Sequence, residues 1–135
     1  MKTDGDPLAR KSQADRLIER AADELHDLLV EAAAELRPFP PFPGAYFTCA
    51  IECEPDSGAN ADYGCIVVKE DGELYELQVG IDRTSMEMGS TDPVALRSEE
   101  TRPVRLHPRD YIVYAYNGLV AVTEKLMEQR ETQRR

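Results

Sequence analysis

The sequence predicts an α+β fold: an antiparallel meander of three strands, or four, with a long N-terminal and a long C-terminal helix packed on one face. Apolar residues recur at helical spacing over residues 12–37 and again over residues 108–131. Residues 45–81 instead alternate apolar and polar side chains, as strands with one buried face do. Within this stretch, the pair Asp71-Gly72 is a strong signal for a β-hairpin turn.

Length and composition indicate one folded domain. A chain of 135 residues that is 41% hydrophobic and 31% charged can bury a core. We expect a single domain over residues 12–131, a disordered N-terminal tail over residues 1–11 and a C-terminal tail over residues 132–135. The sequence has no apolar run of membrane-spanning length and no signal-peptide pattern, so we expect a cytoplasmic protein with no membrane partner.

The charge of the chain is strongly negative and unevenly distributed. The formal net charge is −10, and residues 38–97 contain three basic and eleven acidic side chains, a net charge of −8. An acidic region of this kind repels phosphate backbones, which argues against duplex nucleic acid as a partner. A basic protein or peptide, or a cation, is compatible with this surface, although an acidic surface usually serves only solubility.

The first helix is expected from Ser12, which with Asp15 resembles a capping box, to the residue before Pro38. Its acidic side chains lie late in the helix, where they oppose the helix dipole. Either core packing outweighs this cost or a basic partner relieves it. His26 lies at the edge of the apolar stripe and is interpreted as a boundary residue. The apolar stripe consists of Ile18, Ala21, Ala22, Leu25, Leu28, Leu29, Ala32, Ala33 and Leu36.

The connector PFPPFPG, residues 38–44, is expected to be stiff and extended. Phe39 and Phe42 can fold down to close the end of the core. Four prolines in seven residues also allow a second interpretation, a ligand for a polyproline-binding domain.

A two-residue type I′ loop at Asp71-Gly72 sets the strand register that we predict. It places Val68 opposite Tyr75 and Ile66 opposite Leu77. The expected core face then contains Ile66, Val68, Tyr75, Leu77, Val79 and Ile81, joined by Phe47, Cys49, Ile51 and Cys53 from the preceding strand. The other sheet face is half apolar, so either a partner or another segment covers it or it is an ordinary solvated face. The residues expected in the core are Leu25, Leu29, Ile51, Ile66, Leu77 and Leu119.

The three cysteines are interpreted as free thiols. Cys49 and Cys53 lie four residues apart on one strand, about 13 Å, which is too far for a disulfide or a shared zinc ion. Cys65 falls on the opposite sheet face in the predicted register. The loop at residues 54–62 has oxygen-rich side chains but fails the calcium-loop pattern, so we expect no metal and no cofactor.

The last part of the chain predicts a short edge strand at residues 102–107 and a helix that begins at Pro108. The apolar residues of this helix span roughly 200° of its circumference, which is wider than contact with one sheet face needs. A second subunit is the simplest way to cover the part of this apolar surface that the sheet and the first helix leave exposed.

Catalytic motifs are absent from the sequence, including a phosphate-binding glycine loop, G-x-S-x-G, H-E-x-x-H and C-x-x-C. The remaining candidate site is a cluster at the start of the last helix: Arg102, Arg105, His107 and Arg109. A helix N-terminus with converging arginines attracts anions, although the same arginines can simply pair with the acidic surface.

The order of helix, three strands, irregular segment and helix in a small acidic chain is similar to that of secretion-chaperone-like domains. This similarity of size, charge and element order implies no site residue. The wide apolar stripe of the last helix, the half-apolar second sheet face and the acidic surface lead us to expect a non-catalytic interaction protein, an adaptor or a chaperone-like domain, that acts as a homodimer. The alternative is a small-molecule module or enzyme that uses the cluster at residues 102–109 to hold an anion.

Overall fold

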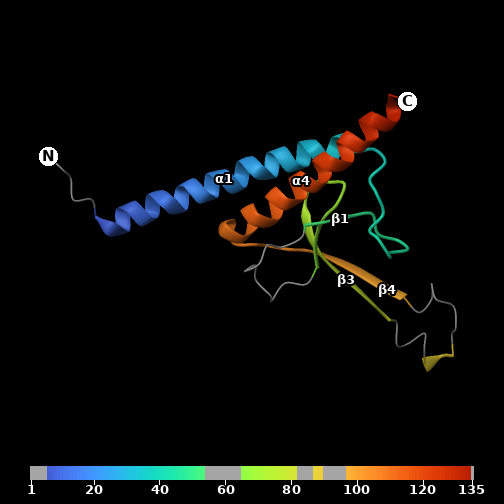
Figure 1. Ribbon diagram of the computed structural model, residues 1–135. Coiled ribbons are helices and arrows are strands. Elements are labelled where there is room, and N and C mark those ends of the chain that lie inside the picture. The colour runs from blue at the N-terminus through green and yellow to red at the C-terminus, as the bar shows by residue number, and fades with distance from the viewer. Residues whose placement is uncertain (1–5, 54–64, 82–86, 90–96, 135) are drawn as a thin grey trace.

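The computed structural model describes residues 6–53, 65–81, 87–89 and 97–134. It has the predicted α+β architecture, in which two long helices lie on one side of an antiparallel sheet (Figure 1). The sheet has four strands in the order β1-β2-β3-β4, so it is a meander. The elements are α1 (Pro7–Glu35), β1 (Ile51–Glu52), β2 (Cys65–Val68), β3 (Leu74–Ile81), β4 (Arg97–Pro103) and α4 (Pro108–Gln133).

Helix α1 begins earlier than predicted. Asp6 is its N-cap and accepts a hydrogen bond of 3.0 Å from the backbone N–H of Leu8, and Pro7 occupies the first helical position. Residues 7–11, expected in a disordered tail, are therefore helical, while residues 1–5 lie outside the described residues. The first half of α1 projects beyond the rest of the protein (Figure 1), and all side chains from residue 6 to residue 17 are exposed.

Helix α4 extends to Gln133, two residues into the predicted C-terminal tail. It runs in the same direction as α1 and packs against it (Figure 1). Near the ends of the two helices, Arg130 Nη2 lies 3.9 Å from Glu35 Oε1. Gly118 brings α4 close to the sheet, because a Cβ atom at this position would lie 2.9 Å from the Sγ atom of Cys53.

The predicted register of the β2–β3 hairpin is wrong by one residue. Val68 pairs with Leu74, and Val67 pairs with Tyr75. The loop has three residues, 70–72, because the Lys69 N–H donates a hydrogen bond of 3.3 Å to the Glu73 carbonyl and so closes the loop. Since residues on a strand alternate between faces, this shift moves the β3 side chains from Leu74 to Gln78 to the face opposite the predicted one. The side chains of Val79 and Ile81, also predicted for the core, lie outside those that the structure describes.

The turn differs from the predicted type I′ loop, which needs the left-handed conformation at two residues. Gly72 has a φ of 79°, whereas no residue other than glycine has a positive φ in the part of the chain that the structure describes. Asp71 therefore cannot form the type I′ turn, and its side chain instead accepts a hydrogen bond of 2.9 Å from the Glu73 N–H. A Cβ atom on Gly72 would lie 2.5 Å from the Val30 Cα, so this turn packs directly against α1.

The main core lies between the helices and the sheet. Of the residues predicted for it, Leu29, Ile51 and Ile66 are buried there, and Leu25 and Leu119 pack against it while partly buried. Cys53 is also inside, as predicted, and Leu74 replaces Leu77 and Tyr75 on this face because of the register shift. The buried members of the core are Leu29, Ala32, Ala33, Leu36, Phe39, Ile51, Cys53, Ile66, Val68, Leu74, Tyr114, Ala115 and Val122.

A second, smaller core lies on the other face of the sheet. Ala50, Val67 and Leu77 are buried there, and Phe42, Cys65 and Tyr75 pack against them. The cover comes from residues 41–49, which we call the covering segment. This segment turns back at Pro43-Gly44, where the Ala45 N–H donates a hydrogen bond of 2.9 Å to the Phe42 carbonyl.

The reversal at Pro43-Gly44 explains why β1 is shorter than predicted. Cys49 forms an isolated bridge with Pro41 instead of extending the sheet. As a result, Phe47 is 68% exposed and Cys49 is exposed, although both were expected to point into the core. Phe39 does close the end of the main core, as predicted, whereas Phe42 packs on the opposite face of the sheet.

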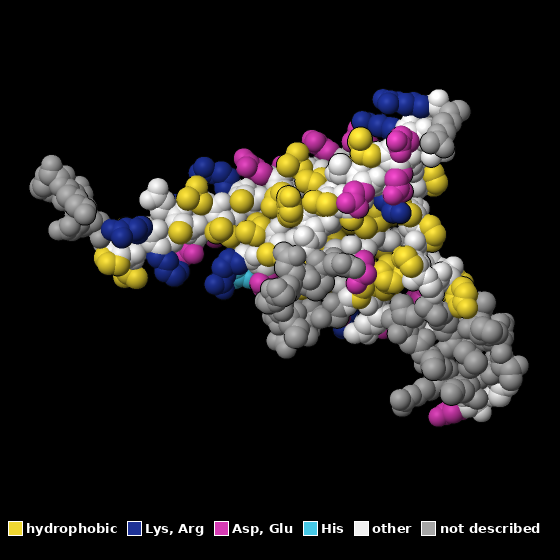
Figure 2. Space-filling view, in the orientation of Figure 1, with side chains coloured by type: hydrophobic (Ala, Val, Ile, Leu, Met, Phe, Trp, Pro, Cys, Tyr) yellow, Lys and Arg dark blue, Asp and Glu magenta, His cyan; other side chains and the backbone are white. Residues whose placement is uncertain are grey.

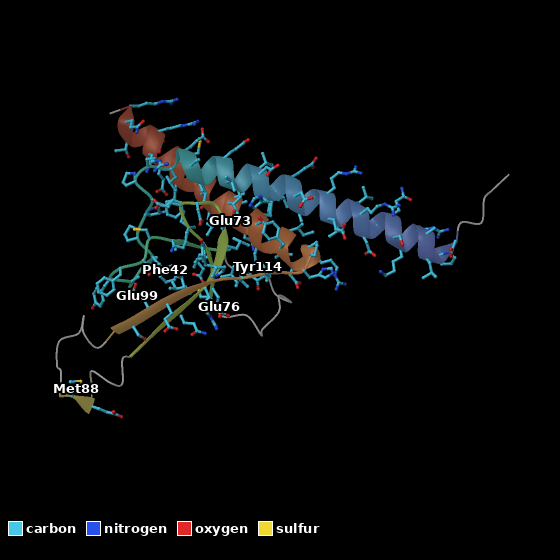
Figure 3. All side chains as sticks on the ribbon, turned by 180° about the vertical axis from the view of Figure 1, so that it is seen from behind. Phe42, Glu73, Glu76, Met88, Glu99 and Tyr114 are labelled. Atoms are coloured by element: carbon cyan, nitrogen blue, oxygen red, sulfur yellow. The ribbon has the colours of Figure 1, made fainter. Side chains whose placement is uncertain are left out.

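Glu99 of β4 holds the covering segment in place (Figure 3). Its carboxylate accepts hydrogen bonds from the backbone N–H of Tyr46 at 2.6 Å, the backbone N–H of Phe47 at 3.1 Å and the Thr48 hydroxyl at 2.8 Å. Charge-assisted hydrogen bonds of this kind are stronger than neutral ones. One acidic side chain therefore fixes the cover of the second sheet face.

The fourth strand exists but lies mostly before the predicted range of 102–107, which it overlaps only at Arg102 and Pro103. β4 pairs with β3 from Arg97, opposite Ile81, to Pro103, opposite Tyr75. Val104 and Leu106, whose alternation suggested the strand, pack against the main core from a segment outside the sheet. Four of the seven residues in β4 are charged, so this edge strand lacks the alternating pattern on which the prediction depended.

Candidate functional site

The four residues of the predicted anion site lie on β4, on the connection that follows it and at the start of α4. Arg102 lies on β4, where its Nη2 atom is 2.6 Å from Glu76 Oε1 on the neighbouring strand. This pairing with an acidic side chain is the alternative role considered for the cluster. Arg105 lies exposed between β4 and α4.

His107 and Arg109 do lie together, at the start of α4. His107 is the N-cap of the helix, and its Nδ1 atom accepts hydrogen bonds from the backbone N–H of Arg109 at 3.2 Å and from the Arg109 Nε atom at 3.3 Å. The imidazole thus replaces the usual Ser, Thr, Asp or Asn cap. This contact gives His107 a structural role in starting the helix.

An open hollow of about 400 Å³ lies between this helix start and the projecting half of α1. Its charges are mixed: Lys11 and Arg109 face the carboxylates of Asp15 and Glu19. Lys11 Nζ lies 2.8 Å from Asp15 Oδ2, and this hydrogen bond lowers the pKa of Asp15. Two carboxylates at the rim oppose an anionic ligand, and neither Arg102 nor Arg105 lines the hollow. Anion binding by the full cluster stays a prediction.

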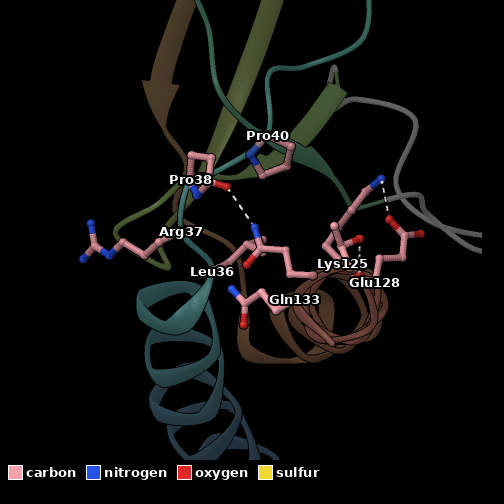
Figure 4. Close-up of a pocket in the computed structure, with 9 residues that line it drawn as sticks. Leu36, Arg37, Pro38, Pro40, Lys125, Glu128 and Gln133 are labelled. Carbon is pink, nitrogen blue, oxygen red and sulfur yellow. Dashed lines mark hydrogen bonds and ion pairs between the residues drawn. The ribbon is translucent and has the colours of Figure 1, made fainter. Parts of the chain in front are cut away.

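A second hollow, of about 370 Å³, lies at the opposite end of the helix pair (Figure 4). Leu36 and Pro40 contribute apolar surface, and Gln129 donates a hydrogen bond of 3.3 Å to the Pro38 carbonyl. Lys125 and Glu128 form an ion pair of 3.6 Å on the rim. The lining contains no histidine or cysteine, and its one carboxylate is already paired. The arrangement provides no acid–base pair for catalysis.

A polar junction that the sequence did not reveal connects α1, the β2–β3 turn and α4. His26 Nε2 lies 2.8 Å from Glu73 Oε2, and this contact raises the pKa of His26 above 6.5. The His26 ring lies 6.5 Å from that of Tyr111, and burial raises the pKa of Tyr111 to about 12. His26 and Glu73 are 47 residues apart. No local pattern could predict their contact, which joins α1 to the hairpin turn.

The three cysteines are free thiols, as predicted. Burial raises the pKa of Cys53 to about 12 and that of Cys65 to about 11. Because the thiolate is the nucleophile and the metal ligand, neither group is activated at neutral pH. Cys53 belongs to the main core and Cys65 packs in the second, so they lie on opposite faces as expected.

The outer side of the helices carries exposed apolar side chains (Figure 2). On α4, Tyr116 is 58% exposed, Val120 is 39% exposed and Met127 is 61% exposed. Their spacing of four and seven residues puts them on one face of the helix, the face opposite the buried residues. On α1, Leu17 is 54% exposed and Leu28 is 49% exposed. Such a surface is typical of a protein–protein contact.

The described residues contain no candidate metal site and no helix that could span a membrane. Within the described ranges, no group of three or more histidine, cysteine, aspartate or glutamate side chains is placed to hold a metal ion. The calcium alternative at residues 54–62 lies outside these ranges. Neither described helix is apolar enough over a sufficient length to span a membrane. Comparison with protein-family models, with curated proteins and with solved structures found no match.

Proposed function

We propose that this protein is a non-catalytic interaction protein that acts as a homodimer through the outer face of α4. The proposal rests mainly on the following observation. Residues 111–123 contain no Asp, Glu, Lys or Arg, yet Tyr116 and Val120 within this segment are exposed. A helix without charge around its whole circumference is typical of a buried helix, so the outer face of α4 is suited to burial in an assembly.

The character of the exposed residues supports a contact surface. Tyrosine is enriched among the residues that dominate binding energy, because it combines a large apolar ring with a polar tip. Methionine, here Met127, adapts its shape to a partner surface. A second copy offers the same apolar surface, and two-fold symmetric homodimers are the commonest assemblies. The acidic surface of the chain suits a basic protein or peptide as the further partner of an adaptor.

Sedimentation at micromolar concentration tests this proposal. The parent chain is expected to sediment as a dimer. Tyr116→Lys places a charge in the interface and should raise the dimer dissociation constant about thirtyfold, the effect of losing about 2 kcal/mol at a hot spot. The matched control is Tyr46→Lys, because Tyr46 is 52% exposed on the covering segment, away from the helices.

Two results would overturn the proposal. The first is a parent chain that stays monomeric across the micromolar range. The second is a Tyr46→Lys variant that weakens association as much as Tyr116→Lys does, since this would place the interface elsewhere. Circular dichroism of both variants establishes that they retain the fold.

A further inference from the structure

Helix α1 carries a second stripe of residues that the core does not use. Its members are alternately four and three positions apart, so they lie within about 50° of one line along the helix. Seven of the eight are exposed and Ala21 is half-buried. The stripe, called the outer stripe below, consists of Arg10, Ala14, Leu17, Ala21, Glu24, Leu28, Glu31 and Glu35.

Charge divides α1 into two opposite halves. Residues 7–20 contain four basic and two acidic side chains, a net charge of +2. Residues 21–35 contain five acidic side chains and neither lysine nor arginine, a net charge of −5. The last turn has no basic residue, so the acidic half also opposes the dipole of its own helix. The basic half is the one that projects from the protein (Figure 1).

We propose that the outer stripe of α1 pairs antiparallel with the outer stripe of a second copy. In the register that places Leu17 against Leu28 of the second copy, Arg10 faces Glu35 of that copy. Two-fold symmetry repeats both contacts, so the interface contains two leucine pairs flanked by two ion pairs. This inference rests on the homodimer proposed above and adds its orientation and register.

Charge complementarity favours a second copy as the occupant. In the antiparallel orientation, each basic half lies on an acidic half of equal length over about 40 Å of helix. The positive end of each helix dipole also approaches the negative end of the other. A parallel pair would instead place five carboxylates against five carboxylates. A basic peptide would neutralise the acidic half but would leave Leu17 and the projecting basic half exposed.

Charge reversal tests the ion pairs. Arg10→Glu places two carboxylates opposite each other at both ends of the interface, and we expect the dimer dissociation constant to rise about tenfold. Glu35→Arg should weaken the dimer similarly, and it also removes the 3.9 Å contact of Glu35 with Arg130 of the same chain, so the rescue by the double variant is the decisive measurement. The double variant Arg10→Glu with Glu35→Arg restores opposite charges and should recover most of the parent affinity. Arg16→Glu is the matched control, because Arg16 lies about 100° around the helix from Leu17 and faces no charge in this register.

Disulfide cross-linking tests the orientation. All variants carry Cys49→Ser, because Cys49 is the exposed native thiol. Leu17→Cys chains mixed with Leu28→Cys chains should cross-link under mild oxidation. Leu17→Cys chains alone should not, because the two equivalent positions are about 16 Å apart along the axis, beyond the reach of a disulfide. Cross-linking of Leu17→Cys chains with each other would indicate the parallel orientation and overturn the inference.

The outcomes separate this inference from the homodimer itself. A dimer that Tyr116→Lys weakens but that Arg10→Glu, Glu35→Arg and the mixed cross-link leave unaffected would overturn the antiparallel α1 contact alone. A monomeric parent chain would overturn both. A monomeric parent that binds a basic peptide only while Glu31 and Glu35 are intact would show that the occupant is a different protein.

Discussion

Two surfaces of this protein have a similar composition, but the chain itself covers only one of them. The second face of the sheet and the outer face of the helices both mix apolar with polar side chains. The sheet face is covered by residues 41–49 of the same chain, in which Phe42 packs against the second core and Glu99 accepts hydrogen bonds from the backbone of Tyr46 and Phe47. The helix face is left with Tyr116 and Met127 exposed.

The difference teaches that a half-apolar face does not by itself indicate a partner. The sequence alone does not indicate this cover, because it depends on the chain reversal at Pro43-Gly44 and on the hydrogen bonds that Glu99 accepts from the backbone of the covering segment. An apolar face points to a partner after the chain's own segments have been accounted for. By this criterion the proposed interaction surface lies on the helices and not on the sheet.

The largest expected effect is on the covered face. Leu77→Ala should destabilise the fold by about 2–5 kcal/mol, because it leaves a cavity in the second core. Leu28→Ala, at a site that is 49% exposed, should change stability by less than about 0.5 kcal/mol when the chain is monomeric. Urea unfolding at low protein concentration measures both. Equal losses would mean that the second face is as open as the helix face.

A smaller effect should follow from releasing the cover. Glu99→Ala removes the acceptor of two backbone N–H groups and one hydroxyl, at a cost of about 1–3 kcal/mol. Hydrogen exchange of the Tyr46 and Phe47 amides should also become faster. Glu100→Ala is the neighbouring control, since Glu100 is exposed and should change neither quantity. Unchanged exchange in the Glu99 variant would show that other contacts hold the segment.

The smallest effect concerns the junction of α1 with the hairpin turn. Because the Glu73 carboxylate raises the pKa of His26, their contact stabilises the fold fully below pH 6.5 and loses this effect as the pH rises past the raised pKa. His26→Gln should therefore cost more stability near pH 6 than near pH 9, by less than about 1 kcal/mol at this partly exposed site. Chemical unfolding at the two pH values measures the difference. An equal cost at both values would contradict the role of charge.

Periodicity was sufficient to predict the fold class and the positions of both long helices. The helical spacing of Leu25, Leu29 and Leu119 correctly indicated residues that pack in or against the main core. The local signal for the start of each helix is a capping residue followed by proline. This signal was recognised at His107-Pro108 but missed at Asp6-Pro7. The same cap chemistry operates at both positions.

Register and surfaces were harder to predict, for a physical reason. Asp-Gly permits two-residue and three-residue loops, and a loop with one more residue reverses the faces of β3. The position of Val30 against Gly72 fixes the choice, and this contact joins residues 42 apart in sequence. The pairing of Arg102 with Glu76 and the hold of Glu99 on Tyr46 likewise depend on the completed sheet.

The edge strand β4 limits the ways in which copies of this protein can associate through their sheets. Its seven residues, RSEETRP, end in a proline and include charges of both signs, features that resist the addition of a foreign strand to a sheet edge. At the other edge, β1 is only two residues long and provides little template for pairing. Fibrous growth through the backbone is thus disfavoured at both margins of the sheet. Concentrated solutions of this chain should remain clear, with self-association confined to side-chain contacts of its helices.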